Sequence, residues 1–337
     1  MNSSIWSVDS KYNEILEIAN SFQKSKVFFT AIELNLFTTL GEDRLTAKEI
    51  AHKLNTDPHN TERLLNALCS MNLLLKHQNL YENSPMAKQH LLKEGEDYIG
   101  ELHHISDLWE IWSHLTYSVK NGKPKTFKTI NDKDADWIRN FLHSLKWKAK
   151  YEAPEVVKKM NLRNAKRVLD LGCGPCSYLI EICENYPLIE CVGIDYPNVV
   201  TEIEKVSKIK DFGDRIKLIP ADVYIDDIGG GYDVVLISYL LNEYSIWDNI
   251  ELLKKVYTSL NKNGIVYIHQ QVINDDKISP KSAVMNSLNM MVNTLEGDIL
   301  TETELWVILK EAWFDKIVIT NTEFETKIIS GQKLTSF

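Results

Sequence analysis

The sequence predicts an α/β protein in which a parallel sheet covered by helices follows a long helical region. From position 11 to about position 160, apolar residues recur mostly at helical spacing. From Lys166 onward, compact runs rich in Val and Ile alternate with amphipathic stretches, which is typical of a parallel sheet with helices on both faces. A short polar turn separates the last two apolar runs, so we expect an antiparallel hairpin at the sheet edge.

Each predicted element corresponds to a particular run of residues. Helices are expected in YNEILEIANSFQKSKVFFTAIELNLFTTL, TAKEIAHKL and TERLLNALCSMNLL. Parallel strands are expected in KRVLDL, ECVGIDY, IKLIPADV, YDVVLISYLL and GIVYIHQQVI. The hairpin is expected in KIVIT and TKIISGQ, on either side of the turn NTEFE. Together these runs predict one parallel sheet that is covered by helices on both faces and closed at its edge by the hairpin.

Composition and charge narrow the classes of function. The 337 residues are 44% hydrophobic and 25% charged, enough to bury one sizeable core and a second smaller one. The formal net charge of −9 argues against a surface that follows nucleic-acid phosphates. The opening residues, MNSSIWSVDSKYNEIL, lack the basic and apolar regions of a secretory signal, and no window is long enough to span a bilayer. We therefore expect a cytoplasmic protein without a nucleic-acid or membrane partner.

The stretch LDLGCGPCSYL, residues 169–179, has two interpretations. Cys173 and Cys176 form a Cys-x-x-Cys pair at a strand-to-helix turn, where thiol–disulfide enzymes place a redox dithiol. Gly172 and Gly174 instead suit a turn that lets the backbone approach a bound nucleotide. The chain has five cysteines, which are few for its length and odd in number, and this does not suit a disulfide scaffold.

Acidic residues at successive strand ends favour the nucleotide interpretation. Asp170 precedes the glycines on the first strand, Asp195 ends the second, and Asp222 follows the third. Ligands bind beyond the carboxyl ends of parallel strands, where Asp195 can accept hydrogen bonds from ribose hydroxyls and Asp222 can meet an adenine amino group. A zinc site is disfavoured because two of its four ligands would fall within a helix and a strand; the four are Cys173, Cys176, Cys183 and Cys191.

Over nearly its whole length the chain resembles the class I S-adenosylmethionine-dependent methyltransferases. It is most similar to the small-molecule O-methyltransferases with an N-terminal winged-helix dimerisation domain, such as the hydroxyindole and caffeate O-methyltransferases. The matching segments of the second half are VLDLGCGPCSYL, VGIDYPNVV, DRIKLIPADVY, YDVVLISYLLNEYSIWDN, LNKNGIVYIHQQV and LTETELWVILKEAWFDKIVI. The first half matches in AKEIAHKLNTDPHNTERLLNALCSMNLL, YENSPMAKQHL and WSHLTYSVKNGKP.

The resemblance implies three regions and a cofactor. We expect an all-helical winged-helix dimerisation domain over residues 1–100 and a helical connector that contributes to the active site over 101–160. Residues 161–337 are expected to form a domain that binds S-adenosylmethionine, an α/β fold with the Rossmann-like seven-stranded sheet of class I methyltransferases and a C-terminal antiparallel hairpin. The glycines are expected against the methionine part of the cofactor, the strand-end acids on its ribose and adenine, and an aromatic ring beside the adenine. The expected contacts are Asp170, Gly172, Gly174, Asp195, Tyr196, Asp222, Val223 and Ser238.

The sequence departs from the family at the catalytic position. O-methylating members commonly present His-Asp-Trp after the fourth strand, whereas this chain has Asn242-Glu243-Tyr244. Asn does not titrate near neutral pH and so cannot act as a general base. The two carboxylates that often support the His are also replaced, by Gln270 and Ile299. Asn242, Glu243 and Gln270 are predicted as the catalytic residues, with Glu243 the nearest ionisable candidate for a base and with O, C or N open as the acceptor atom.

A small, aromatic acceptor is predicted from the residues expected to line its pocket. Apolar and amide side chains recur at helical spacing in MNSLNMMVNTLEG, and polarizable thioethers adapt to flat rings. The predicted acceptor contacts are Trp109, Met285, Asn289 and Met290, and no metal is expected.

Two other functions stay open from the sequence. One is an enzyme that binds the cofactor but catalyses a step other than methyl transfer, since a fold supports cofactor binding better than any one reaction. The other, a winged-helix regulator that binds DNA, is disfavoured because the predicted recognition helix, HNTERLLNALCSMNLL, carries one Arg and no Lys. We expect this region to form a homodimer instead.

Overall fold

The computed structural model describes residues 10–93, 97–99 and 101–334. The chain divides into two compact units, Met1–Ser106 and Asp107–Phe337. Among the described residues, no helix is both long and apolar enough to cross a membrane.

The first unit is mainly helical, and polar caps fix where several helices begin. Thr46 and Glu49 form a reciprocal capping box at the start of α3, and Asp57 accepts a hydrogen bond from the backbone at Asn60 at the start of α4. Buried Leu, Ile and Phe side chains form one core cluster. The elements are α1 (Ser10–Glu33), α2 (Leu36–Leu40), β1 (Leu45–Thr46), α3 (Ala47–Leu54), α4 (Pro58–Ser70), β2 (Leu74–His77), β3 (Leu80–Asn83), α5 (Pro85–His90) and α6 (Glu101–Trp112), the last of which continues into the second unit.

A small antiparallel sheet of order β1-β3-β2 also belongs to this unit. The helical character expected here is confirmed, but the expectation of an all-helical region omitted these three strands. Strands of two to four residues are too short to show a period of two, and only Leu74 of β2 is buried. The turn between β2 and β3 is made by Gln78, a non-glycine residue with φ 57°.

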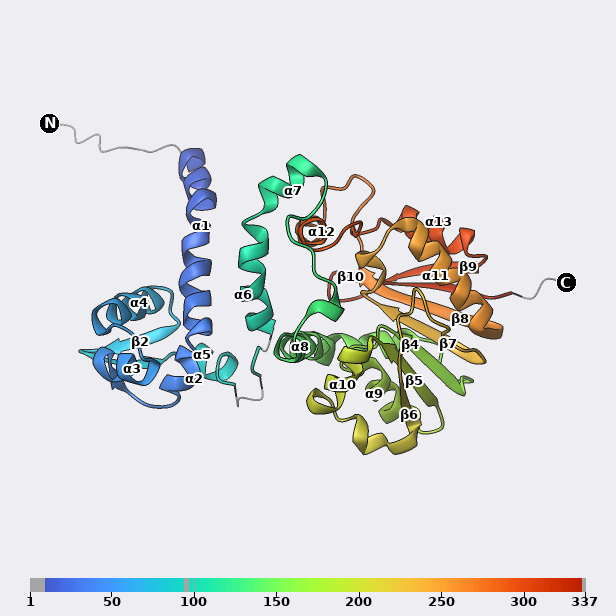
Figure 1. Cartoon of the computed structure of the whole chain (residues 1–337), viewed down its shortest axis with the longest axis horizontal. Helices are drawn as coiled ribbons and strands as arrows, with labels where there is room; N and C mark the ends of the chain where they lie inside the picture. Colours follow the sequence, from blue (N-terminus) through green and yellow to red (C-terminus); the bar gives the residue numbers. More distant parts are fainter. Residues whose placement is uncertain (1–9, 94–96, 100, 335–337) are drawn as a thin grey trace. The chain divides into compact units, whose positions relative to one another are not determined.

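The second unit confirms the predicted seven-stranded sheet with its C-terminal antiparallel hairpin. The strand order is β6-β5-β4-β7-β8-β10-β9, in which β10 runs antiparallel to both of its neighbours (Figure 1). The helices are α7 (Leu115–Asn121), α8 (Ala135–Lys159), α9 (Ser177–Asn185), α10 (Pro197–Val206), α11 (Ile246–Ser259), α12 (Lys281–Asn293) and α13 (Glu302–Glu311). The strands are β4 (Arg167–Leu171), β5 (Glu190–Asp195), β6 (Ile216–Pro220), β7 (Tyr232–Ser238), β8 (Leu260–Gln271), β9 (Asp315–Asn321) and β10 (Thr326–Gln332). Three 3-10 turns are η1 (Ile130–Asp132), η2 (Ile209–Arg215) and η3 (Leu241–Glu243).

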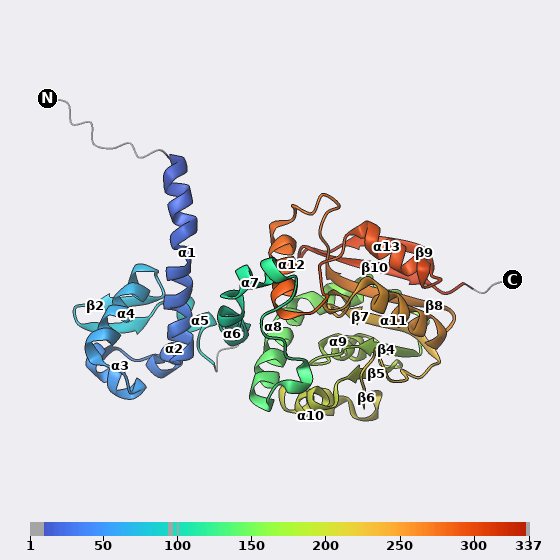
Figure 2. The same cartoon turned by 45° about the horizontal axis from the view of Figure 1, so that its top comes forward.

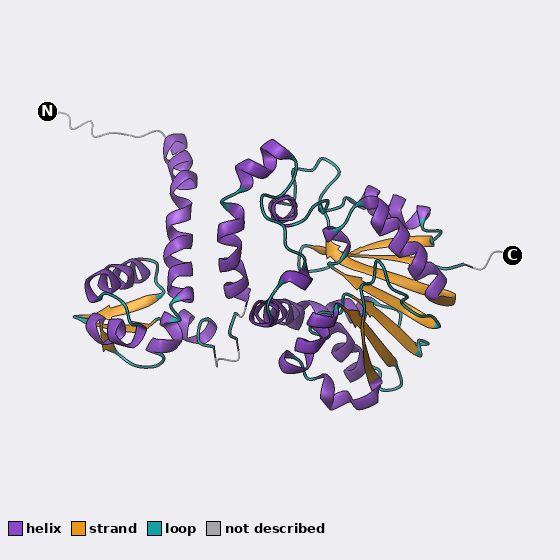
Figure 3. Cartoon of the chain, viewed as in Figure 1, coloured by secondary structure: helices purple, strands orange, loops and turns teal. Residues whose placement is uncertain are grey.

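Helices cover both faces of this sheet, as Figure 2 and Figure 3 show. One buried cluster contains side chains of α8, α9 and α10, and a second contains side chains of α11 and α13. The interior strand β8 contributes to both clusters, because its side chains alternate between the two faces: Tyr267 packs in the first cluster, and Val266 and Ile268 pack in the second. The carboxyl ends of the parallel strands meet at one edge of the sheet, where the predicted site residues gather.

Candidate functional site

The glycine-rich turn between β4 and α9 is held against the end of β5. Gly172 and Gly174 have φ of 69° and 48°, a region that favours glycine. The backbone N–H of Gly172 donates to the carbonyl of Ile194 at 2.9 Å, and that of Gly174 donates to Asp195 Oδ2 at 2.8 Å. A β-carbon at Gly174 would lie 3.3 Å from the side chain of Leu145 on α8. The turn therefore presents bare backbone at the carboxyl edge of the sheet.

The cysteines of this turn serve packing. Cys173 and Cys176 are free and buried, with their sulfurs 3.7 Å apart. The contact with Cys176, followed by burial, raises the pKa of the Cys173 thiol well above its ordinary value. A β-carbon at Gly193 would lie 2.8 Å from the Cys173 sulfur, so this side chain fills the space that Gly193 leaves. A redox dithiol needs an accessible thiolate, and these features favour the cofactor interpretation.

Cys183 and Cys191 form a separate buried pair with sulfurs 3.5 Å apart. No group of three or more His, Cys, Asp or Glu side chains among the described residues is arranged to hold a metal ion.

Asp170 is a buried carboxylate without a partner. It lies on β4 with 1% of its surface exposed, and neither of its oxygens has a hydrogen-bond partner within the described part of the chain. Burial, followed by the charge of Asp195, raises its pKa well above the ordinary range. An unpaired buried carboxylate is costly, and such groups are normally paired with an opposite charge. The α-ammonium and sulfonium of S-adenosylmethionine are charges of the required sign, so Asp170 fits this cofactor.

Asp195 is fixed at the end of β5. It accepts hydrogen bonds of 2.8 Å from the backbone N–H groups of Gly174 and Tyr196, one on each carboxylate oxygen. Burial nevertheless raises its pKa to about 6. Each oxygen can accept a further hydrogen bond, and a carboxylate held in this way can bind two neighbouring ribose hydroxyls.

Three tyrosines form a cluster beside Asp195. The hydroxyls of Tyr196 and Tyr244 are 2.8 Å apart, and the ring of Tyr244 stacks on that of Tyr224 at 3.7 Å. Tyr224 lies just after Asp222 and Val223, and its backbone N–H donates to Asp222 Oδ1 at 3.0 Å. Tyr196 and Val223, which were predicted near the adenine, are thus brought to one region.

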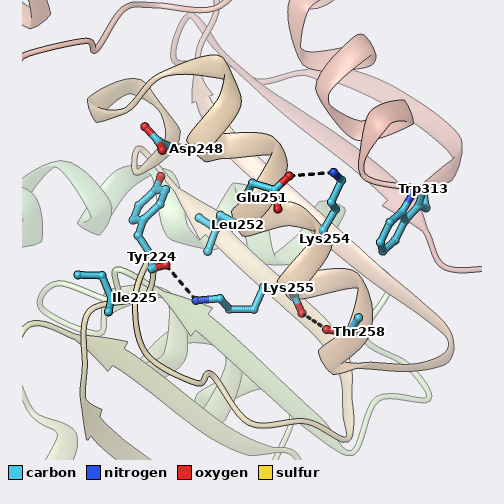
Figure 4. A pocket seen from close by; sticks show the side chains of 9 residues that line it. All are labelled: Tyr224, Ile225, Asp248, Glu251, Leu252, Lys254, Lys255, Thr258 and Trp313. Atoms are coloured by element: carbon cyan, nitrogen blue, oxygen red, sulfur yellow. Dashed lines mark hydrogen bonds and ion pairs between the residues drawn. The ribbon is translucent and has the colours of Figure 1, made fainter.

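Lys255 on α11 clamps the same loop and was not found from the sequence, because no motif marks it. Its Nζ donates to the carbonyls of Val223, Tyr224 and Asp226 at 2.9, 3.2 and 2.8 Å. Figure 4 shows Lys255 reaching toward Tyr224. The surrounding hollow of about 510 Å³ has two lysines, and the other, Lys254, is paired with Glu251. Both ammonium groups are engaged, so the hollow does not have the character of an anion site.

Ser238 ends β7 and joins a buried polar network. Its hydroxyl lies 3.2 Å from Nδ1 of His269, which is also 3.1 Å from the hydroxyl of Tyr178. The other ring nitrogen of His269 is 2.8 Å from the hydroxyl of Thr326. Burial, followed by the charge of Lys148, lowers the pKa of His269 to about 3. His269 is therefore neutral and fully engaged, and it does not supply the base that the sequence lacks.

The three predicted catalytic residues differ in environment. Asn242 in η3 is 3% exposed with no partner for Oδ1, and Gln270 on β8 is fully buried with no partner for Oε1 or Nε2 among the described residues. Glu243 has an exposed side chain, and desolvation by the surrounding protein, followed by the charge of Asp195, raises its pKa to about 7. Glu243 is thus the titratable member of the three.

The predicted acceptor residues are only partly brought together. Asn289 on α12 accepts a hydrogen bond of 3.0 Å from the indole N–H of Trp112, one turn after the predicted Trp109. Met290 packs against a small cluster that contains Ile299. Trp109 is half-buried, whereas Met285 is 48% exposed. The bond to Trp112 fixes α12 against the end of α6.

Comparison with known families matches residues 109–315 to the O-methyltransferase domain and residues 16–93 to the O-methyltransferase dimerisation domain. Among curated proteins, the 3-hydroxy-5-methyl-1-naphthoate 3-O-methyltransferase of Streptomyces sahachiroi is 26% identical over 288 residues, which is 83% of each chain. The S-adenosyl-L-methionine-dependent methyl transferase PigF of a Serratia strain is 26% identical over 341 residues, which is 97% of each chain.

Solved structures share the fold. PigF with SAH superposes with a TM-score of 0.89 at 24% identity, covering 95% of this chain and 99% of that one. Human N-acetylserotonin methyltransferase in complex with SAM superposes with a TM-score of 0.87 at 23% identity, covering 99% of this chain and 100% of that one.

Proposed function

The chain belongs to the O-methyltransferase family with an N-terminal dimerisation domain, and from this premise we propose that it transfers the methyl group of S-adenosylmethionine to a small aromatic acceptor. The observation that carries the proposal is Asp170, a buried carboxylate that lacks a partner next to the glycine turn. When bound, S-adenosylmethionine supplies a methyl group on a positively charged sulfur, open to displacement by a nucleophile.

We assign the cofactor contacts by position. Asp170 would face the ammonium of the methionine part, the backbone of Gly172 and Gly174 would lie against the same part, and Asp195 would hold the ribose. Tyr196 and the loop of Asp222 and Val223 would border the adenine, with Lys255 holding that loop in place. Ser238 lies at the end of β7 within the same edge of the sheet.

Methyl transfer in this chain would depend on positioning more than on a strong base. Holding acceptor and donor in line, away from water, can provide much of the acceleration of such a displacement. Asn242 and Gln270 would orient the acceptor, and Glu243, with a pKa near 7, is suited to take up its proton. This arrangement suits an acidic phenol, an amine or an electron-rich ring carbon, so O, N and C all stay open as the acceptor atom.

An aromatic acceptor is supported by the relatives and by the lining. The relatives are named for a hydroxynaphthoate, for tetracenomycin polyketide synthesis and for acetylserotonin. In this chain Trp109, Asn289 and Met290 offer aromatic, amide and thioether contacts, with Met285 nearer the solvent.

We also propose a homodimer formed through the N-terminal unit. The dimerisation domain includes most of α1, and α1 exposes a row of large apolar side chains at helical spacing. Tyr12, Ile15, Ile18 and Phe22 are 55%, 65%, 76% and 54% exposed. A contiguous apolar face of this kind indicates a protein partner, and light scattering of the full chain tests whether that partner is a second copy.

Calorimetric titration of S-adenosylmethionine and S-adenosylhomocysteine into the full chain tests the cofactor assignment. We expect both to bind to the wild type, binding to be lost in Asp195→Ala, and binding to be unchanged in Asp214→Ala, which removes an exposed carboxylate elsewhere in the same unit. Absence of binding to the wild type would refute the proposal. Binding of both ligands without methylated product from any phenol, amine or ring-carbon acceptor would support the second candidate, a cofactor-binding enzyme that does not transfer methyl.

A further inference from the structure

Gln270 is a buried amide with both of its polar atoms unsatisfied. The side chain is fully buried, and neither Oε1 nor Nε2 has a partner in the described part of the chain. Leaving a buried donor or acceptor unsatisfied is costly, and native proteins rarely keep such groups without a reason. Among the described residues, Asp170 and Gln270 are the two buried side chains for which two polar atoms lack partners.

Gln270 and the short turn η3, which contains Asn242, lie at the same end of the sheet. Side chains alternate along β8, so Gln270 projects to the face opposite His269, whose ring is bonded to Ser238. On that opposite face Ile268 packs in the cluster of α11 and α13, and so does Leu241, the neighbour of Asn242. β7 and β8 pair in parallel with Ser238 opposite His269, which brings η3, just beyond β7, to the carboxyl end of β8.

The segment that follows α12 packs against η3 at Gly297. A β-carbon at Gly297 would lie 2.4 Å from the carbonyl oxygen of Asn242, so only glycine allows this approach. The amides of α12 are satisfied by their own neighbours: Asn286 donates to Gln271 at 2.9 Å, and Asn289 accepts from Trp112. Among the described amide side chains of the second unit, Asn242 and Gln270 are the two with a buried polar atom that lacks a partner, and they lie next to a helix predicted to contact the acceptor.

We propose that Gln270, assisted by Asn242, binds an acceptor whose aromatic ring carries a lactam edge, that is, an N–H donor beside a carbonyl acceptor. A Gln side chain offers an N–H donor and a carbonyl acceptor side by side, so a cis-amide edge satisfies both at once. Both residues are uncharged, and a charged edge would be desolvated there without an opposite charge. The inference rests on the proposed function and specifies the substrate class of that site.

The test uses three ligands with two fused rings, titrated by calorimetry into the full chain saturated with S-adenosylhomocysteine. 2-Quinolone carries the lactam edge, coumarin replaces its N–H with oxygen at nearly the same shape and is likewise uncharged, and 1-naphthol lacks both groups. We expect the quinolone to bind at least tenfold more tightly than the coumarin, because the coumarin leaves one buried group without its partner. The naphthol is expected to bind more weakly than either.

Substitutions at Gln270 and Gln332 test whether Gln270 recognises the lactam edge or only supports the fold. Gln270→Leu is expected to reduce the preference for quinolone over coumarin to within about twofold while keeping the affinity for S-adenosylhomocysteine. Gln270→Met, an unbranched chain of similar size, serves if the leucine variant does not fold. Gln332→Leu is the matched control, since Gln332 pairs with Ile265 in the middle of β8, away from Gln270, and this variant should keep the preference.

The outcomes distinguish the two proposals. If the wild type does not bind S-adenosylhomocysteine, the proposed function fails and the lactam inference fails with it. If S-adenosylhomocysteine binds but the coumarin binds as tightly as the quinolone, or none of the three ligands binds, the lactam inference alone is overturned. A preference that survives Gln270→Leu overturns it as well.

Discussion

The variant Asp170→Asn tests the cofactor site most directly, because it should change stability and affinity in opposite directions. Asp170 is 1% exposed and has no partner, and its pKa is raised well above the ordinary range. Replacing the carboxyl group with an amide of the same shape removes an ionisable group whose charged form is disfavoured by burial in the free protein. It also removes the proposed partner of the cofactor's ammonium.

The gain in stability comes from removing an ionisable group, because the amide lacks partners just as the carboxyl group does. One pKa unit of difference between the folded and unfolded states corresponds to about 1.4 kcal/mol, so the free variant should gain on the order of 1–2 kcal/mol and several degrees in Tm at pH 8. A hydrogen bond to a charged group contributes about 1.5–3 kcal/mol, so the Kd for S-adenosylmethionine should rise roughly 10- to 150-fold.

The raised pKa of Asp170 determines how the stability of the folded protein changes with pH. The pKa of Asp170 is higher in the folded protein than in the unfolded chain, where it is about 4. Between these two values the folded protein holds the proton that the unfolded chain has lost. Stability of the wild type therefore falls as pH rises through this window. The difference in Tm between the variant and the wild type should be smallest near pH 4 and should grow toward pH 8.

Thermal unfolding from pH 4 to pH 8, together with calorimetry of S-adenosylmethionine, measures both effects. Asp195 titrates in both proteins, so its contribution largely cancels in the comparison. A variant that is less stable than the wild type at every pH and binds the cofactor equally well would show that Asp170 is a structural residue. The assignment of the cofactor site would then lose its main support.

Three further predictions concern other residues of the site. Lys255→Met should raise the KM for the cofactor roughly 5- to 30-fold and lower kcat much less, because the clamp acts through the adenine loop; equal losses in both parameters would contradict this role. Gly174→Ala should weaken cofactor binding at least tenfold, since its β-carbon would lie 3.3 Å from Leu145 in the turn, whereas Gly122→Ala carries the same kind of backbone strain with nothing nearby and should bind normally. Glu243→Gln should lower kcat about 100-fold and abolish the rise of rate with pH near 7, because a base acts in its deprotonated form; a pH–rate profile that keeps this rise would exclude Glu243 as the base.

Much of the second unit could be predicted because its pattern is strong. Five apolar runs rich in β-branched residues alternate with helices, and the glycine turn and strand-end acids mark where a parallel sheet binds ligands. The structure places Gly174 and Asp195 within one hydrogen bond of each other, although they are distant in sequence. Topology alone brings the carboxyl ends of β4 and β5 together, so this contact follows from the fold.

Other contacts depend on the three-dimensional path of long side chains, which no local pattern encodes. In the sequence Lys255 is an ordinary basic residue of an amphipathic helix. In the structure its ammonium group donates hydrogen bonds to three backbone carbonyls of a loop about thirty positions earlier in the chain. The short strands β2 and β3 gave too few residues to show a period. The exposure of Met285 depends on how α12 is rotated, which helical spacing alone does not determine.

Buried polar atoms without hydrogen-bond partners mark the two proposed binding places. Most buried polar side chains of the second unit are well paired: Glu202 with Arg139 and Lys205, and His269 with its three hydroxyl neighbours. The two buried side chains with two unpartnered polar atoms in the described residues, Asp170 and Gln270, lie next to the last residues of β4 and β8, at the edge where parallel strands bind ligands. A ligand that satisfies such groups binds only the folded chain and must therefore stabilise it. S-adenosylmethionine should raise Tm through Asp170, and a lactam acceptor should raise it further through Gln270. The first increment should therefore shrink in Asp170→Asn and the second in Gln270→Leu.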